Sequence, residues 1–138
     1  MNNSIEDAMV SLRHTLDEFR SAINAGDVTK VYDITAEDFE LMAPGQPAVK
    51  GEDARRFLST LVTDFNAELK PFSNEQLVVC GDYAIQRYTY DLTLTPKSGG
   101  APIVQRGDGL HIFRLDAAGR WRLAMDVFTS VTAAAATT

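Results

Sequence analysis

The last third of the chain, Tyr83–Val131, reads YAIQRYTYDLTLTPKSGGAPIVQRGDGLHIFRLDAAGRWRLAMDVFTSV and decides the fold. It predicts three long β-strands in succession, over Tyr83–Thr95, Ile103–Asp116 and Trp121–Val131. β-Branched and aromatic residues dominate each run, and short turns separate the runs. Strands joined by short turns pair antiparallel. The end of the chain therefore predicts a long meandering sheet.

Helical patterning is confined to the residues before 66. Apolar residues recur at spacings of three and four along residues 5–23, which predicts a first helix with one buried stripe. Gly26 ends this helix, and Asp27 caps a short second one. A third helix follows Gly51, and its apolar stripe runs to Phe65. Helices thus lead and the sheet follows.

The remaining segments complete an α+β fold. Short strands are predicted over residues 39–43 and 75–79, which gives the order α-α-β-α-β-β-β-β. We expect a curved, mostly antiparallel sheet wrapped around about three N-terminal helices, a cone-shaped α+β barrel that encloses a pocket. One domain is predicted over residues 1–131, and the alanine-rich residues 132–138 predict a disordered tail.

Composition and charge exclude several classes of protein. The net charge is −6, all of it within the first 70 residues, and no basic stripe is present, so we expect no nucleic-acid partner. No apolar run approaches the roughly 20 residues that span a bilayer, and the N-terminus lacks a signal-peptide pattern, so we expect no membrane partner and a cytoplasmic protein. The single cysteine, Cys80, has no partner for an internal disulfide.

Both faces of the last two strands carry apolar residues. In this interpretation one face packs on the helices. The other face carries Leu110, Ile112 and Phe128 and is too apolar to be exposed to solvent in a monomer. This face predicts a homodimer. Gly107 and Gly109 alternate on the same face as His111, where they either leave space for a cavity or mark a β-bulge.

Three stretches of the chain resemble a known superfamily. Residues 19–27, FRSAINAGD, look like the helix end and turn of ketosteroid-isomerase-like proteins, and residues 43–51, APGQPAVKG, look like the loop before their third helix. The C-terminal residues 106–126 are similar to small SnoaL-like proteins of the same nuclear-transport-factor-two-like superfamily. The resemblance covers nearly the whole chain and implies a cone of curved sheet closed by helices.

The same resemblance does not carry over the catalytic set of ketosteroid isomerase, which is a carboxylate base with a tyrosine and a protonated aspartic acid as oxyanion hole. The base position falls at Met42 or Ala43, the tyrosine position at Phe19 and the aspartic acid position at His111. Steroid isomerisation by that mechanism is therefore not expected.

Two titratable residues remain as candidates for catalysis. His111 lies mid-strand, and an ordinary histidine pKa near 6.5 suits proton transfer; the alternative is a core histidine bonded to the backbone. Asp126 lies among apolar residues and is either a general base or a structural partner of Arg106, Arg114 or Arg122, which share its predicted face.

The pocket is predicted between the first and third helices and the sheet, and its expected ligand-binding residues are Phe19, Tyr32, Met42, Phe57, Tyr88, Tyr90, His111 and Phe113. The alternative interpretation is that most of these aromatic residues belong to the hydrophobic core. No phosphate loop, dinucleotide fingerprint or metal-ligand spacing is present, so no cofactor or metal is expected.

Three functions are compatible with these features. The favoured one is a protein that binds a small apolar or amphipathic molecule without converting it. The alternative is a cofactor-independent isomerase, cyclase or hydrolase that uses His111 or Asp126 as acid or base. The weaker third is a dimerisation or assembly domain. Fold alone does not choose among them.

Overall fold

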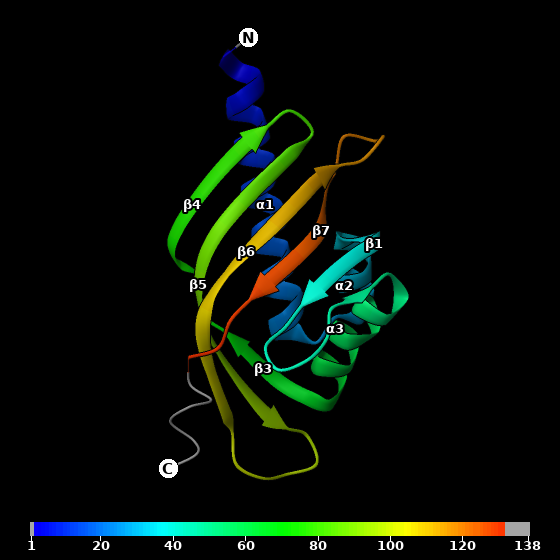
Figure 1. Ribbon diagram of the computed structural model, residues 1–138, viewed down its shortest axis with the longest axis vertical. Coiled ribbons are helices and arrows are strands. Elements are labelled where there is room, and N and C mark those ends of the chain that lie inside the picture. Colours follow the sequence, from blue (N-terminus) through cyan, green and yellow to red (C-terminus); the bar gives the residue numbers. More distant parts are fainter. Residues whose placement is uncertain (1, 132–138) are drawn as a thin grey trace.

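Seven strands form one curved sheet that curls around the helices without closing, and the predicted α+β cone is confirmed (Figure 1). The computed structural model describes residues 2–131, so the predicted tail lies outside the described residues and the domain boundary stays a prediction. The helices are α1 (Asn2–Ala25), α2 (Val28–Ile34) and α3 (Glu52–Asp64). The strands are β1 (Thr35–Met42), β2 (Val49–Lys50), β3 (Phe65–Leu69), β4 (Ser73–Cys80), β5 (Tyr83–Pro96), β6 (Ile103–Leu115) and β7 (Trp121–Phe128).

The sheet follows the order β2-β1-β7-β6-β5-β3, and β4 also pairs with β5. All pairs are antiparallel except β1 with β7, which run parallel. β5 has the most partners in the sheet. β6 pairs along one of its edges, and along the other edge β4 pairs with its first half and β3 with its second half. In Figure 1 this long strand bends where its pairing changes from β4 to β3, and α1 lies behind the sheet on its inner face.

Two strands were not predicted from the sequence. β2 has two residues, and β3 begins at Phe65, the residue assigned to the end of the third helix. α3 ends one residue earlier, and Phe65–Leu69 instead pairs with the far half of β5. Helical periodicity could not show this, because the strand takes its backbone hydrogen bonds from a partner more than 20 residues away.

The core lies between the helices and the inner face of the sheet. Leu12 and Leu16 on α1, Phe39 on β1 and Phe113 on β6 are almost fully buried there. The end of α1 is set by Gly26, whose φ of 69° is the left-handed conformation that glycine adopts without strain. Asp27 then accepts a hydrogen bond from the Lys30 amide and caps α2, as predicted.

A β-bulge in β7 decides which of its side chains point inward. Ile112 of β6 pairs with Met125, but the next residue, Phe113, pairs with Leu123, so Ala124 has no partner on β6. Strict alternation assigns Asp126 and Phe128 to the outer face together with Leu110. The extra residue reverses the alternation, and both side chains point inward instead.

The predicted outer face is therefore corrected at Phe128, which lines the pocket. Leu110 remains on the outer face and is 42% exposed. An apolar row crosses four neighbouring strands there through the paired residues Val78, Ile85, Ile112 and Met125. Val78 and Ile85 are exposed, and Ile112 and Met125 are half-buried. Exposed apolar surface of this kind marks subunit contacts, and the homodimer stays a prediction.

Candidate functional site

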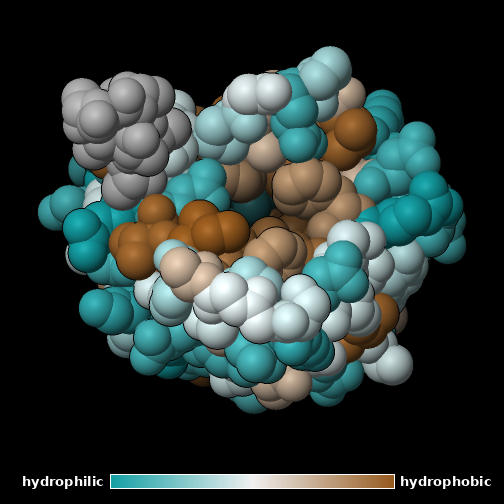
Figure 2. All heavy atoms as spheres, turned by 90° about the horizontal axis from the view of Figure 1, so that it is seen from below, coloured by the Kyte–Doolittle hydropathy of each residue, from teal (hydrophilic) through white to brown (hydrophobic). Residues whose placement is uncertain are grey.

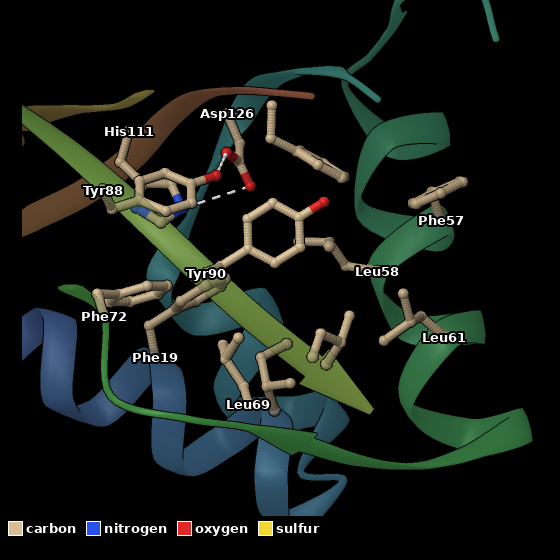
Figure 3. Close-up of a pocket in the computed structure, with 13 residues that line it drawn as sticks. Phe19, Phe57, Leu58, Leu61, Leu69, Phe72, Tyr88, Tyr90, His111 and Asp126 are labelled. Atoms are coloured by element: carbon tan, nitrogen blue, oxygen red, sulfur yellow. Dashed lines mark hydrogen bonds and ion pairs between the residues drawn. The ribbon is translucent and has the colours of Figure 1, made fainter. Parts of the chain in front are cut away.

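A pocket of about 80 Å³ lies between α1, α3 and the inner face of the sheet. Figure 2 shows the hollow at this end of the molecule with hydrophobic side chains around its rim. Figure 3 shows the side chains of α3 on one wall and those of β5 and β6 on the other. The lining residues are Phe19, Ile23, Phe57, Leu58, Leu61, Leu69, Phe72, Tyr88, Tyr90, Leu92, His111, Asp126 and Phe128.

Five of the eight predicted ligand-binding residues lie at this pocket: Phe19, Phe57, Tyr88, Tyr90 and His111. The structure places the other three elsewhere. Tyr32 on α2 donates its hydroxyl to Glu52 at 2.8 Å. Met42 alternates with the buried Leu41 at the end of β1, so its side chain takes the opposite face. Phe113 is fully buried in the core and does not reach the pocket.

Most of the lining residues missed from the sequence are aliphatic. Leu58 and Leu61 belong to the same stripe of α3 as Phe57, so the helix period contained this signal. Phe72 lies in the connection between β3 and β4, where no periodicity applies. Phe128 was hidden by the bulge in β7.

Four polar side chains, which we call the polar cluster, meet at the inner end of the pocket: Gln86 and Tyr88 from β5, His111 from β6 and Asp126 from β7. The Tyr88 hydroxyl donates to Asp126 Oδ1 at 2.7 Å, and His111 Nε2 lies 3.4 Å from Asp126 Oδ2 (Figure 3). His111 Nδ1 lies 2.7 Å from Gln86 Oε1. All four residues are at most 6% exposed. The pocket is thus apolar except for the Tyr90 hydroxyl and the inner end, where Asp126, His111 and Tyr88 border it.

The partners of Asp126 differ from those expected. Arg106, Arg114 and Arg122 were its predicted partners, and each instead pairs with another carboxylate. The bulge explains the difference, because it turns Asp126 toward His111, the residue opposite it on β6. The structure therefore brings together the two catalytic candidates that the sequence had assigned to opposite faces.

Gly109 explains how Tyr88 reaches Asp126. Tyr88 and Gly109 are cross-strand partners, and a Cβ on Gly109 would overlap the hydroxyl and Cζ of Tyr88. Without a side chain on Gly109, the tyrosine ring crosses β6 and stacks on His111, with ring centroids 4.3 Å apart. Gly107 likewise admits the backbone carbonyl of Thr129. The two glycines thus admit neighbouring groups, and neither of the two predicted explanations, free cavity space or a bulge, describes them.

Burial keeps the tyrosine hydroxyls of the site protonated. Desolvation, assisted by the nearby charge of Asp126, raises the pKa of Tyr88 far above its ordinary value. The same two causes, burial first, raise the pKa of Tyr90 to about 12. Tyr88 is therefore a hydrogen-bond donor to Asp126 throughout the neutral range. Tyr90 donates its hydroxyl to the Thr129 carbonyl at 2.7 Å.

The three positions aligned with the ketosteroid isomerase catalytic set differ in their relation to the pocket. Phe19 lines it and meets the His111 ring edge-on at 5.6 Å between centroids. Ala43 follows the end of β1 and is not among the lining residues. His111 is part of the polar cluster, and the carboxylate beside it, Asp126, comes from a different strand than the one the resemblance implied.

The described residues meet the requirements of neither a metal site nor a membrane-spanning helix. Across residues 2–131, the His, Cys, Asp and Glu side chains form no group of three or more placed to hold a metal ion. Within the same range, each helix is too short or too polar to cross a bilayer.

Comparison with known proteins supports the fold. A conserved protein from Planctomyces limnophilus superposes with a TM-score of 0.80 at 21% identity, over 91% of this chain and 99% of that one. A ketosteroid isomerase-like protein from Erwinia carotovora atroseptica gives a TM-score of 0.65 at 22% identity, over 88% and 95% of the two chains. A protein from Novosphingobium aromaticivorans, named "Putative Scytalone Dehydratase", gives 0.80 at 14% identity, over 95% and 89%.

The sequence itself gives the family. No curated protein matches it. The SnoaL-like domain family, however, matches residues 16–124, which is well over half of the chain and includes the whole polar cluster except Asp126. The resemblance drawn from the sequence motifs is confirmed, and the chain belongs to the SnoaL-like domain family.

Proposed function

We propose that the chain binds a small, uncharged, mainly apolar molecule that carries one polar group. The observation that carries this proposal is the distribution of polarity in the pocket. Hydrocarbon side chains from α1, α3 and β3 make the walls, and Asp126 with His111 lies at the inner end. Ligand sites typically combine an apolar lining with a few convergent polar groups that fix the ligand's orientation.

The chemistry of the inner end favours a ligand that donates a hydrogen bond. Each oxygen of a carboxylate accepts more than one hydrogen bond, so Asp126 keeps acceptor capacity beyond the Tyr88 hydroxyl and His111. A ligand hydroxyl fits this capacity. A ligand carboxylate would instead place a second negative charge beside Asp126 in an apolar surrounding, which is costly.

The proposal is tested with three ring compounds of similar size: p-cresol, toluene and p-toluate. We expect p-cresol to bind roughly 10- to 150-fold more tightly than toluene, because one hydrogen bond to a charged group is worth roughly 1.5–3 kcal/mol. p-Toluate should bind weakest. Dissociation constants come from NMR shift titrations of the labelled protein. Absence of saturable binding, or tightest binding of p-toluate, contradicts the proposal.

Variants locate the site. Asp126→Asn keeps the shape and one acceptor oxygen but removes the charge, so the preference for p-cresol over toluene should fall by about 1 kcal/mol or more. His111→Ala should weaken p-cresol binding by about 1–3 kcal/mol, and His111→Phe should not restore it although the ring shape is nearly kept. Tyr32→Phe is the matched control, since Tyr32 lies away from the pocket, and it should leave every affinity unchanged.

A second candidate function is proton transfer on the bound molecule, as in a cofactor-independent isomerase, cyclase or hydrolase. The distance of 3.4 Å between His111 Nε2 and Asp126 Oδ2 favours it, because the two groups can share and pass on a proton beside the pocket. Similar structures include the proteins named "Putative Scytalone Dehydratase" and "ketosteroid isomerase-like protein", and these names are compatible with such chemistry.

This second function is tested with cyclohexanone in D₂O. A base takes a proton from the carbon beside the carbonyl, and the resulting enolate takes a deuteron back, so mass spectrometry records deuterium uptake without any cofactor. We expect uptake faster than with Asp126→Asn, and the same rate with Tyr32→Phe as with the unchanged chain. Equal rates with and without the Asp126 carboxylate would leave binding as the function.

A further inference from the structure

A chain of hydrogen bonds connects His111 to the surface on the side away from the pocket. Gln86 donates its amide nitrogen to Glu75 Oε2 at 2.6 Å, and Arg13 on α1 holds the same carboxylate oxygen at 2.9 Å. Gln86 is fully buried, while the side chain of Glu75 is 24% exposed. The sequence of contacts is Arg13, Glu75, Gln86, His111 and Asp126.

The orientation of the Gln86 amide follows from its neighbours. An ionised carboxylate is an acceptor only, so the amide group facing Glu75 must be the NH₂ donor. The carbonyl oxygen of Gln86 then necessarily faces His111. The opposite orientation would set two acceptors against each other at 2.6 Å on a buried side chain, which is strongly unfavourable.

The orientation of Gln86 in turn fixes the hydrogen on His111. An amide oxygen is also an acceptor only, so Nδ1, 2.7 Å from Gln86 Oε1, must carry a hydrogen and donate it. Nε2 is the nitrogen left to gain or lose a proton. It faces Asp126 Oδ2 at 3.4 Å, and a proton held between these two acceptors removes their repulsion.

We propose that Glu75 and Gln86 are positioning residues that hold His111 in its Nδ1–H form, so that Nε2 is the nitrogen that shares a proton with Asp126 or with a bound molecule. The remaining neighbours of the ring make no competing hydrogen bond to it. Tyr88 stacks on its face, and Phe19, Phe72 and Phe113 meet it edge-on. The proton-exchanging nitrogen of His111 is thus selected by a carboxylate on another strand, β4, which is not among the pocket residues.

The test reads the nitrogens of His111 directly, by long-range ¹H–¹⁵N correlation spectra of the protein labelled at histidine. The chain has two histidines, and His14→Asn assigns the signals. Protonated and unprotonated imidazole nitrogens differ widely in chemical shift. We expect Nδ1 of His111 to give the signal of a protonated nitrogen from pH 5 to 9, with any change falling on Nε2. The titratable groups that face the ring are Asp126 and Tyr88.

Glu75→Gln keeps the size of the side chain and lies at the edge of the core. With an amide at position 75, either its oxygen or its NH₂ can face Gln86, so the orientation of Gln86 is no longer enforced and part of the Nδ1–H signal should be replaced by an Nε2–H signal. Gln86→Leu removes the acceptor altogether, and the hydrogen should then move to Nε2, where Asp126 accepts it. Asp108→Asn, which removes a carboxylate from the outer face of β6, should change nothing.

Two results would overturn the proposal. One is a neutral His111 in the unchanged chain with its hydrogen on Nε2. The other is an Nδ1–H signal that neither Glu75→Gln nor Gln86→Leu reduces. The inference concerns the histidine of the proposed site, but the spectrum measures no binding. It can therefore fail while p-cresol binding holds, or hold while binding fails.

Discussion

Gly109→Ala should destabilise the protein specifically through Tyr88. The added methyl group would overlap the Tyr88 hydroxyl and Cζ, and would lie 2.9 Å from the Phe128 Cβ. No real Cβ tolerates contacts this close, so the ring of Tyr88 must leave its place against His111. The hydrogen bond from its hydroxyl to Asp126 is then lost, and the buried carboxylate has one hydrogen-bond donor fewer.

The expected magnitude combines two costs. Overpacking of a well-packed site costs about 1–3 kcal/mol. Loss of a buried hydrogen bond to a charged group costs roughly 1.5–3 kcal/mol. Because one displacement causes both, we expect a loss of about 2–5 kcal/mol in the free energy of unfolding.

Urea unfolding followed by the fluorescence of Trp121, the single and buried tryptophan, measures this loss. In a Tyr88→Leu background the overlapping hydroxyl and Cζ are absent and only the 2.9 Å contact with the Phe128 Cβ remains. Gly109→Ala should therefore destabilise that background clearly less, by about 1–3 kcal/mol, the usual cost of overpacking alone. Gly107→Ala is the matched control. Its added methyl group would overlap the Thr129 carbonyl and not Tyr88, so it should lower the free energy of unfolding by the same amount in both backgrounds. An equal cost of Gly109→Ala in the two backgrounds would refute the assigned role of the tyrosine.

Two further predictions concern alkaline stability and assembly. Burial and Asp126 raise the pKa of Tyr90 to about 12, so the folded state favours the neutral phenol; this contribution is complete below the unfolded value near 10 and is lost as pH rises through about 12. The stability advantage of the unchanged chain over Tyr90→Phe should therefore shrink between pH 10 and 12 in urea titrations, and a constant difference would contradict it. Leu110→Asp on the outer face should convert the predicted homodimer to monomers in light scattering, and a monomeric unchanged chain at micromolar concentration would contradict the dimer.

The elements that the sequence predicted well are those with a long local period. The stripe along α1, the caps at Gly26 and Asp27 and the three C-terminal strands are all local signals. β3 was missed because its five residues carry no period of their own, and its pairing with β5 is a tertiary event. Strand propensity in such short segments depends on their partner more than on their composition.

The candidate site was predictable only in part, for a similar reason. His111, Tyr88 and Tyr90 lie on strands whose alternation is regular up to the pocket, so their inward direction could be read from parity. Asp126 and Phe128 follow a β-bulge that no glycine in β7 marks in the sequence. The one extra residue of the bulge reversed the face to which both side chains point. Gln86 carried no signal at all, since its importance comes from Glu75 and His111 on two other strands.

The placement of Asp126 also weighs against a purely structural role. Burying a carboxylate is costly unless it is paired, and here Tyr88 and His111 provide the pairing. A structural pair of this kind is most stable in a closed core, where no other group competes for the carboxylate. Asp126 instead borders a pocket whose other walls are mainly hydrocarbon, and the absence of a side chain at Gly109 is what allows Tyr88 to reach the carboxylate. An arrangement that keeps a buried, pre-oriented carboxylate accessible from an apolar pocket is typical of a site built to receive a polar group on an otherwise apolar molecule.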